Sequence, residues 1–199
     1  MFIELTDHLR CTEPHDEQFL VLLPELLSGR RVIRGDLGCP VCGKVVRLEE
    51  GVADFGGGVA ATGPPGLTAE AIASFLGLTG AGGYVALVGA IGGIADSLRA
   101  LHPGIRFVLV NPPADTLDSE PASVLRAGRL PLKGGSMRGV VVGGDLAADR
   151  SWVADAVRAV LPGLRVVVDG GEPPEDAVEL LGRTEGCWVG KRRDPLAGR

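Results

Sequence analysis

The sequence has few aromatic residues and no long apolar segment. Phe, Trp and Tyr make up 4% of its 199 residues, with a single tyrosine. No apolar run approaches the roughly 20 residues that a membrane-spanning helix needs, and the N-terminus MFIELTDHLR lacks the basic-then-apolar pattern of a secretory signal. Four cysteines without such a signal indicate a reducing compartment, where thiols bind metal or stay free. We therefore expect a cytoplasmic protein that does not act at a membrane.

Positive charge is also scarce. The chain has 20 Lys and Arg against 25 Asp and Glu, a net charge of −5. This balance argues against nucleic acid as the main ligand, although the basic tail GKRRDPLAGR could make a minor contact. Glycine, in contrast, is abundant: the 31 glycines are about twice the usual share of roughly 7%. They are scattered between apolar runs, which is typical of turns.

The composition changes near residue 55. Three of the four cysteines, two of the three histidines and many acidic residues come before it, and runs of Val, Leu and Ala follow. The join FGGGVAATGPPG is typical of a linker. We predict a module at 1–56, a linker at 57–66, a second domain at 67–193 and a flexible tail at 194–199.

In the second domain, continuous apolar runs alternate with amphipathic segments. This alternation is typical of βαβ units with a buried parallel sheet. It predicts an α/β, Rossmann-like fold with a mostly parallel sheet and helices on both faces. We expect strands at 83–89, 105–111, 138–146, 164–170 and 186–192, and helices at 67–78, 92–104, 151–163 and 175–182. Thr68 and Ser151 are the expected N-caps of two helices.

The stretch Cys39-Pro-Val-Cys42, followed by Gly43, has the spacing of a zinc knuckle. Two thiolates three residues apart in a tight turn can bind one ion, and the glycine lets the backbone fold around it. The same C-x-x-C spacing occurs in redox motifs, but these open a helix, whereas CPVCGKVVRLEEG continues into a predicted strand. The pattern therefore favours metal.

A second pair of ligands is expected upstream, and CTEPH supplies Cys11 and His15. With the knuckle they predict a closed Cys₃His site, which indicates a structural zinc ion. His8 remains an alternative to His15, and Glu13 and Asp16 are weaker ones. The competing interpretation is buried cysteines and surface histidines without metal. In a module of about 55 residues, which has little core, the ion would supply folding free energy.

The segment LTDHLRCTEPH…GDLGCPVCGKVVRLEEGVADF resembles the small zinc-ribbon family of methyltransferase-activator subunits and their short bacterial relatives. The residues that match the family pattern are Cys39, Pro40, Cys42, Gly51, Val52, Asp54 and Phe55. Ala53 stands where the family often has proline, and His15 where it often has cysteine. The resemblance covers about the first quarter of the chain. It implies a zinc-stabilised docking module that contacts a methyltransferase fold, here fused directly behind it.

Residues 67–193 resemble a class I S-adenosylmethionine-dependent methyltransferase in the order of their elements and in two phrases. ASVLRAGRLPLKGGSMRGVVVGGDL is similar to the family passage GDAxxLPFxDGSFDxVV, and SWVADAVRAVLPGLRVVV to REAARVLRPGGRLVV. The resemblance implies a cofactor pocket at the glycine loop after the first strand and at the residue after the second. The corresponding residues are Gly89, Ile91, Gly93 and Asn111.

The residues that should hold this cofactor are replaced. Four positions that carry an acid in the family correspond to Leu87, Asn111, Arg126 and Arg138, and the middle glycine of the loop to Ile91. S-adenosylmethionine is a cation with hydroxyl and amine donors, so it needs acceptors. At ~1.5–3 kcal/mol per lost hydrogen bond to a charged group, several losses weaken binding by orders of magnitude. We expect a vestigial pocket and no catalytic residues; Asp145 is more consistent with a cap or loop residue than with a catalytic one.

Two functions follow. The first is a non-catalytic pseudo-methyltransferase, a zinc-stabilised binding or scaffold protein whose partner is a protein, such as a methyltransferase or a translation-related factor, or a second copy of the chain. The second is an active S-adenosylmethionine-dependent methyltransferase with a divergent cofactor loop and an unknown substrate. A nicotinamide-dependent reductase is disfavoured, because GAIGGIA does not spell G-x-G-x-x-G and the only tyrosine, Tyr84, has no lysine four residues later.

Overall fold

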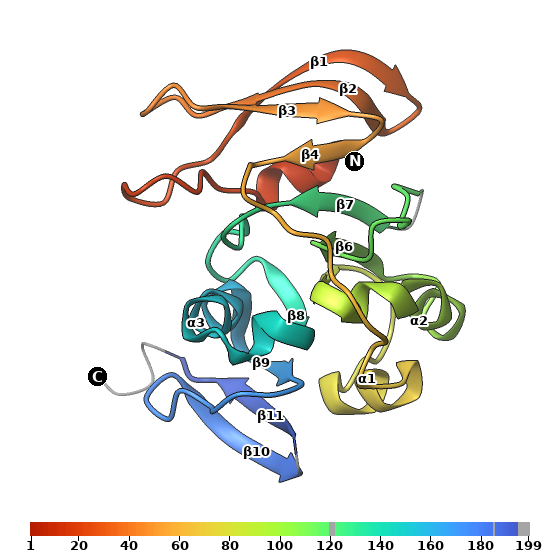
Figure 1. The fold of residues 1–199 in the computed structure, drawn as a ribbon, viewed down its shortest axis with the longest axis vertical. Helices are drawn as coiled ribbons and strands as arrows, with labels where there is room; N and C mark the ends of the chain where they lie inside the picture. The colour runs from red at the N-terminus through yellow and green to blue at the C-terminus, as the bar shows by residue number, and fades with distance from the viewer. Residues whose placement is uncertain (120–121, 185, 195–199) are drawn as a thin grey trace.

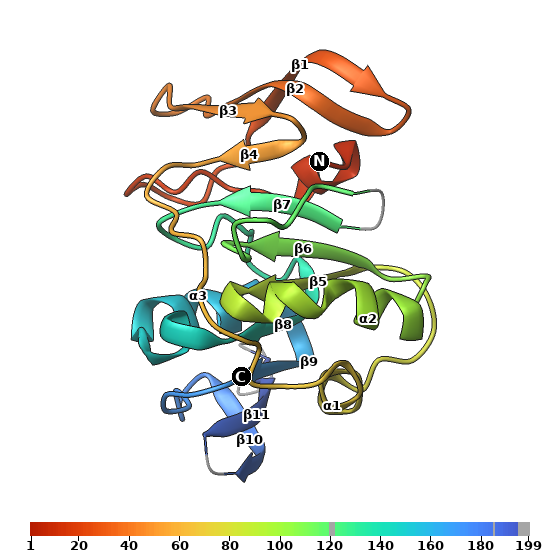
Figure 2. The ribbon, with the colours of Figure 1, turned by 45° about the vertical axis from the view of Figure 1, so that its right-hand side comes forward.

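The computed structural model describes residues 1–119, 122–184 and 186–194 (Figure 1). In this part of the chain, an 11-stranded sheet has the order β1-β2-β3-β4-β7-β6-β5-β8-β9-β11-β10. Helices lie against both faces of its central strands (Figure 2). No helix among the described residues is long and apolar enough to cross a membrane.

The N-terminal part forms an antiparallel meander. A 3₁₀ helix, η1 (Ile3–His8), precedes the strands β1 (Val21–Ser28), β2 (Arg31–Gly38), β3 (Val45–Glu49) and β4 (Val52–Asp54). Buried and exposed residues alternate along β3, so Val46 and Leu48 are buried while their neighbours face solvent. The buried face contributes to the main core of the molecule.

The second part contains the parallel strands and their helices. The strands are β5 (Tyr84–Val88), β6 (Arg106–Val110), β7 (Ala122–Arg126), β8 (Met137–Val142) and β9 (Val160–Val168). The helices are α1 (Ala69–Leu76), α2 (Ala95–Leu101) and α3 (Arg150–Ala159), with 3₁₀ helices η2 (Gly89–Ile94) and η3 (Gly144–Ala148). A hairpin of β10 (Val178–Thr184) and β11 (Cys187–Arg192) ends the sheet.

The parallel strands, counted from β5 in chain order, lie 3-2-1-4-5, which is the Rossmann order. Successive residues of β5 pack on opposite faces: Val85 and Leu87 in the core that includes α1 and α2, Ala86 and Val88 in the core that includes α3. The predicted mixed α/β fold with a mostly parallel central sheet is confirmed.

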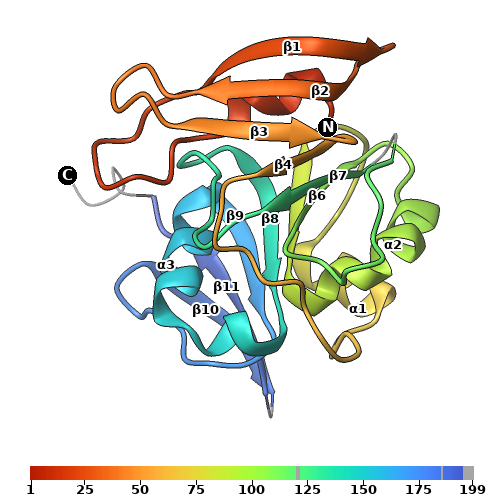
Figure 3. The same ribbon diagram turned by 45° about the horizontal axis from the view of Figure 1, so that its top comes forward.

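The N-terminal meander continues the Rossmann-like sheet directly (Figure 3). β4 pairs in parallel with β7, with Ala53 opposite Leu125 and Asp54 opposite Arg126. A bridge between Leu9 and Leu132 adds a second connection. The division at residues 56 and 67 remains a prediction, but the two parts share one sheet and one core.

Some local predictions differ from the structure. The helix expected at 175–182 is wrong, because Val178–Thr184 pairs with β11 as strand β10, a partner that its apolar periodicity does not reveal. Thr68 is confirmed as an N-cap, since its hydroxyl accepts from the Ala71 N–H at 3.2 Å. Ser151 is not the cap of α3; the Asp149 carboxylate accepts from the Ser151 N–H at 2.8 Å.

Candidate metal centre and cofactor crevice

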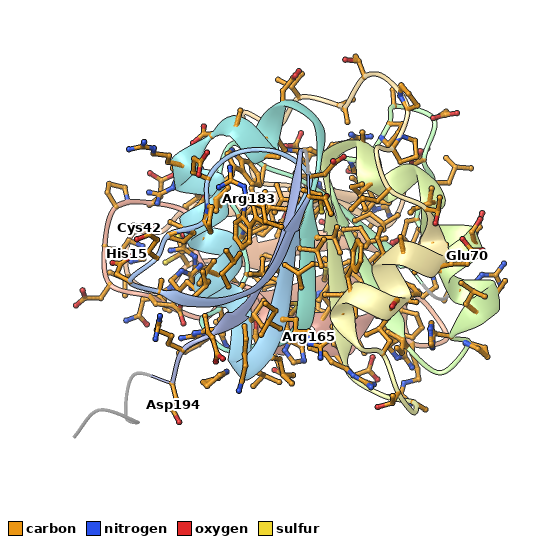
Figure 4. The ribbon with its side chains drawn as sticks, turned by 90° about the horizontal axis from the view of Figure 1, so that it is seen from below. His15, Cys42, Glu70, Arg165, Arg183 and Asp194 are labelled. Carbon is orange, nitrogen blue, oxygen red and sulfur yellow. The ribbon has the colours of Figure 1, made fainter. Side chains whose placement is uncertain are left out.

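Two loops at one end of the meander bring four potential metal ligands together. Cys11 and His15 precede β1, and Cys39 and Cys42 lie in the turn between β2 and β3. Their ligand atoms all lie within 4.8 Å of one another, and His15 and Cys42 are neighbours in Figure 4. Among the described residues, this Cys/His cluster could hold a metal ion.

Two distances within the cluster fit tetrahedral zinc. The Cys11 and Cys42 sulfurs are 3.7 Å apart, and Cys39 Sγ lies 3.5 Å from His15 Nε2. Bond lengths of about 2.3 Å to sulfur and 2.0–2.1 Å to nitrogen, at tetrahedral angles, require about 3.8 Å between two sulfurs and about 3.6 Å between sulfur and nitrogen. Both distances therefore fit without any large movement of the ligands.

The surrounding backbone orients the ligands. In the turn, the Gly43 N–H donates to the Cys39 carbonyl at 3.0 Å, and Gly43 has a φ of 72°, which glycine adopts readily. His15 Nδ1 lies 2.7 Å from the Asp16 carbonyl. Because a carbonyl only accepts, Nδ1 carries the proton and Nε2 presents its lone pair to the cluster. Asp16 thus acts through its backbone, which a residue-type pattern does not reveal.

The thiols differ in acidity. Burial raises the pKa of Cys11 to about 11, whereas the Lys44 backbone N–H lowers the pKa of the exposed Cys42. A metal ligand must be a thiolate, so binding a cation here would release a proton from Cys11. The Lys44 ammonium lies 2.6 Å from a carboxylate oxygen of Glu13. Glu13 is thus paired with Lys44 and is not one of the four residues of the cluster.

His8, the alternative to His15, lies elsewhere. Its ring packs against Tyr84, with the ring centroids 4.8 Å apart. Burial is the main cause of the lowered pKa of His8. Its neighbours belong to the interface between η1 and β5, and it is not part of the described Cys/His cluster.

The second candidate site is the crevice outside the carboxyl ends of the parallel strands. In open α/β sheets, ligands bind there, where the strand order reverses, which in this chain is between β5 and β8. Instead of a gap, the loops after these two strands touch. A Cβ on Gly89 would lie 2.5 Å from the Gly143 carbonyl oxygen, and a Cβ on Gly143 would lie 2.4 Å from Ile91 Cγ1. The Ile91 side chain, 0% exposed, fills the space between the two loops.

Asn111 follows β6, where a Rossmann ligand's ribose is usually held by an acid. The residue is 2% exposed and has a φ of 51°. Its amide nitrogen donates to the Ala127 carbonyl at 2.7 Å, and its amide oxygen accepts from the Ala127 N–H at 2.9 Å. Both polar atoms of the side chain are therefore engaged by backbone. Sequence inspection could not identify Ala127, because a backbone partner leaves no side-chain signal.

The other replaced positions have local structural partners. Leu87 is buried in the core beside α1 and α2. The Arg126 guanidinium donates to the Pro112 carbonyl at 2.8 Å. Arg138 donates to backbone carbonyls of residues 79–82, including Gly82 at 2.9 Å, near the amino end of β8. Gly93 lies beside Pro113, since a Cβ on Gly93 would be 3.7 Å from that ring, and Asp145 is exposed in η3.

The chain matches no protein-family model and no curated protein. Similar solved structures include a chain of the complex between the Haloferax volcanii Trm112 methyltransferase activator and a protein described as a methyltransferase (12% identity, 62% of this chain and 89% of that chain, TM-score 0.47). The antibiotic-resistance methyltransferase Kmr is another (11% identity, 69% and 98%, TM-score 0.43). A third is described as a methyltransferase from an antibiotic biosynthesis pathway of Anabaena variabilis (19% identity, 50% and 42%, TM-score 0.39). At such identities and scores the likeness concerns α/β architecture alone, so activity has to be argued from the residues of this chain.

Proposed function

We propose that this protein is a non-catalytic, methyltransferase-like binding or scaffold protein, stabilised by a structural zinc ion. The observation that carries the proposal is the pairing of Asn111 with Ala127. It removes from the crevice the side chain that would have to bind the ribose of S-adenosylmethionine.

The energetics of this pair oppose cofactor binding. To meet a ribose, the Asn111 amide would have to leave both hydrogen bonds and strand the buried N–H and C=O of Ala127. An unsatisfied buried polar group costs about 1–3 kcal/mol, so two cost at least about 2 kcal/mol. These two unsatisfied groups alone would lower the affinity for S-adenosylmethionine by about 30-fold or more.

The closed loops support the same conclusion. Ile91 stands between the loops after β5 and β8, where a Rossmann ligand approaches the backbone closely. Arg126 presents a donor where the family presents an acceptor, and its guanidinium is engaged by the Pro112 carbonyl. Arg138 lies at the amino end of β8, away from the crevice, and bonds to carbonyls that precede β5. A methyl-donor cofactor would therefore find its close approach to the backbone between these two loops filled by Ile91.

The role proposed for zinc follows from its ligand set. Cys11, His15, Cys39 and Cys42 would fill all four positions of a tetrahedral ion. A closed site leaves no position for water or substrate, so the ion would stabilise the fold and supply no chemistry. Metal analysis of protein purified without chelator should give about one zinc per chain, and a value near zero would remove the metal from the proposal.

A protein is the proposed partner, and the exposed apolar side chains of β1 support this choice. They are Val21, Leu23, Leu26 and Leu27. Apolar side chains gathered on one element of a surface are typical of protein contact sites. A methyltransferase, a translation-related factor and a second copy of the chain all remain proposals.

Calorimetric titration with S-adenosylmethionine and S-adenosylhomocysteine tests the proposal. We expect no binding of either compound at concentrations up to about 1 mM, equivalent to less than about 4 kcal/mol of binding free energy. Micromolar binding would overturn it and favour the alternative, an active methyltransferase with a divergent cofactor loop.

A further inference from the structure

The segment between β4 and α1, residues 56–67, lies across the carboxyl ends of the parallel strands (Figure 1 and Figure 2). We call this segment the strap. At its start, the Gly56 carbonyl accepts from the N–H of Gly128, just beyond β7. Ala61 then reaches the carbonyls of Asn111 and Pro112 after β6. Gly66 packs against the carboxylate of Asp169, which follows β9.

This path matches the width of the parallel sheet. Strands lie about 4.8 Å apart, so the four steps from β7 through β6, β5 and β8 to β9 span about 19 Å. A nearly extended chain covers roughly 3.3 Å per residue, so the eight steps from Gly58 to Gly66 reach about 26 Å. The strap is therefore long enough to cross the ligand side of the whole parallel region.

Close packing at Gly58 fixes the strap over the Asn111 and Ala127 pair. A Cβ on Gly58 would lie 2.4 Å from the Ala127 backbone nitrogen and 2.6 Å from Asn111 Oδ1. Both atoms belong to the hydrogen-bonded pair already described, so neither can move aside cheaply. Only glycine fits at this point, because any side chain would force the strap away from the sheet.

Beyond Gly58 the strap is held weakly. Among residues 57–67, all of which the structure describes, the Ala61 N–H is the one group with a hydrogen bond to the rest of the protein. The Val59 side chain is 78% exposed. Segments with few buried contacts and few protected hydrogen bonds open at low free energy, well before global unfolding.

We propose that residues 56–67 form a displaceable strap that occupies the ligand crevice, and that the close packing of Gly58 on Asn111 and Ala127 holds it closed. This inference rests on the proposed function, since it concerns access to the same crevice. It adds a conformational element: the crevice is covered by the chain itself, and its exposure depends on the close packing at Gly58 and on the Ala61 hydrogen bond.

Amide hydrogen exchange by NMR tests the strap. The N–H groups of Gly128 and Ala61 donate the hydrogen bonds that join the strap to the segments after β7 and β6, so their exchange rates measure the opening of the strap. In Gly58→Ala both amides should exchange at least about tenfold faster, while the Ala86 amide in the centre of β5 should not change. Val59→Ala is the matched control in the same segment and should leave all three rates unchanged.

A second variant guards against misfolding of the first. Ala61→Pro removes the N–H that donates to the carbonyls of Asn111 and Pro112, and it leaves Gly58 unchanged. The exchange rate of the Gly128 amide again measures the opening of the strap. Unchanged Gly128 exchange in both variants would overturn the strap and leave the proposed function intact. Faster exchange in either variant supports it.

Calorimetry with S-adenosylhomocysteine on the wild type and on Gly58→Ala separates the two proposals. No binding by either protein, together with faster exchange in the variant, supports both. Binding by the variant alone supports the strap and overturns the proposed loss of the cofactor site. Binding by the wild type overturns the proposed loss of the cofactor site, and the exchange rates of Gly128 and Ala61 then decide the strap by themselves.

Discussion

Replacing Asn111 by aspartate would introduce an acid at the position where the methyltransferases that this region resembles carry one. If Asn111 faced an open ribose site, the change would be tolerated and would favour cofactor binding. In the structure, the amide nitrogen instead donates to the Ala127 carbonyl, and a carboxylate has no proton to give. N111D therefore places a buried carboxylate oxygen against a carbonyl oxygen.

The cost can be estimated from these contacts. Losing the hydrogen bond removes about 1 kcal/mol, and the unsatisfied Ala127 carbonyl adds about 1–3 kcal/mol. Burial of the new charge adds more, so we expect N111D to be destabilised by at least about 3 kcal/mol at pH 7. For a chain of 199 residues this corresponds to a fall in Tm of roughly 6–12 °C.

The destabilisation should depend on pH. Burial and the facing Ala127 carbonyl both disfavour the charged form, so they raise the folded-state pKa of the new carboxyl above its ordinary value of about 3.9. The folded variant then binds the proton more tightly than the unfolded chain does. The stability of N111D relative to wild type is therefore greatest below about pH 4, falls as the pH rises through the raised folded-state pKa, and stays constant above it.

Urea denaturation from pH 4 to pH 8 measures the free energy of unfolding of N111D and of wild type at each pH. Because the two proteins are compared at the same pH, changes in the protonation of the metal ligands affect both equally and cancel in the difference. D145N, which alters charge on the exposed Asp145, is the control and should stay within about 0.5 kcal/mol of wild type. If N111D were as stable as wild type at pH 7, or bound S-adenosylhomocysteine, Asn111 would be free to face a ligand. The proposed non-catalytic function would then lose its main support.

Three further predictions concern other parts of the molecule. In metal analysis, H15A should contain well below one zinc ion per chain, whereas H8A, which removes the ring beside Tyr84, should retain its zinc. Loss of zinc in H8A alone would contradict the assignment of His15 as the fourth ligand. R10A breaks the ion pair between Arg10 and Asp155, in which the two side chains are 12% and 11% exposed. Because Arg158 remains 3.3 Å from Asp155, urea denaturation should show a loss of about 1–3 kcal/mol in the free energy of unfolding. R129A removes a partner of Asp155 whose side chain is 54% exposed and should cost less than about 1 kcal/mol, so equal losses in the two variants would refute this ranking. Burial raises the pKa of Asp169, so the folded protein binds the proton of this carboxyl more tightly than the unfolded chain does, and the ionised carboxylate destabilises the fold at neutral pH. D169N should therefore raise the Tm at pH 7. A gain in Tm that did not shrink as the pH falls toward 4 would contradict this cause.

The sequence predicts those parts of the fold that depend on local patterns. β5 and most of β6 and β8, namely Phe107–Val110 and Val140–Val142, are apolar because both faces of these strands are buried, and such runs are visible without a structure. The strand β10 was not predicted, because its state depends on pairing with β11 and its apolar spacing fits a helix equally well. The pairing of β4 with β7 could not be predicted, since a three-residue strand gives no sign of its distant partner.

The candidate sites divide in the same way. The C-x-x-C spacing and the upstream Cys11 and His15 predict a metal cluster, because thiol and imidazole groups at such spacing have a definite chemistry. The choice between His8 and His15 needed the fold, which places His8 against β5. Replacement of family acids predicts a weakened cofactor pocket, but the glycine-rich composition of residues 57–66 indicated a linker and gave no sign that it crosses the crevice.

A continuous path of contacts joins the metal cluster to the crevice. The Cys39 N–H donates to the Lys44 carbonyl at 2.8 Å, which fixes the chain at the start of β3. β3 pairs with β4, and β4 pairs with β7 as far as Asp54 opposite Arg126. The next residue, Phe55, donates its N–H to the Arg126 carbonyl at 2.7 Å, and the strap begins immediately after it. Because the strap has few contacts of its own, its position depends on this pairing, and we expect loss of the metal to loosen the strap before it disturbs the strands of the central sheet.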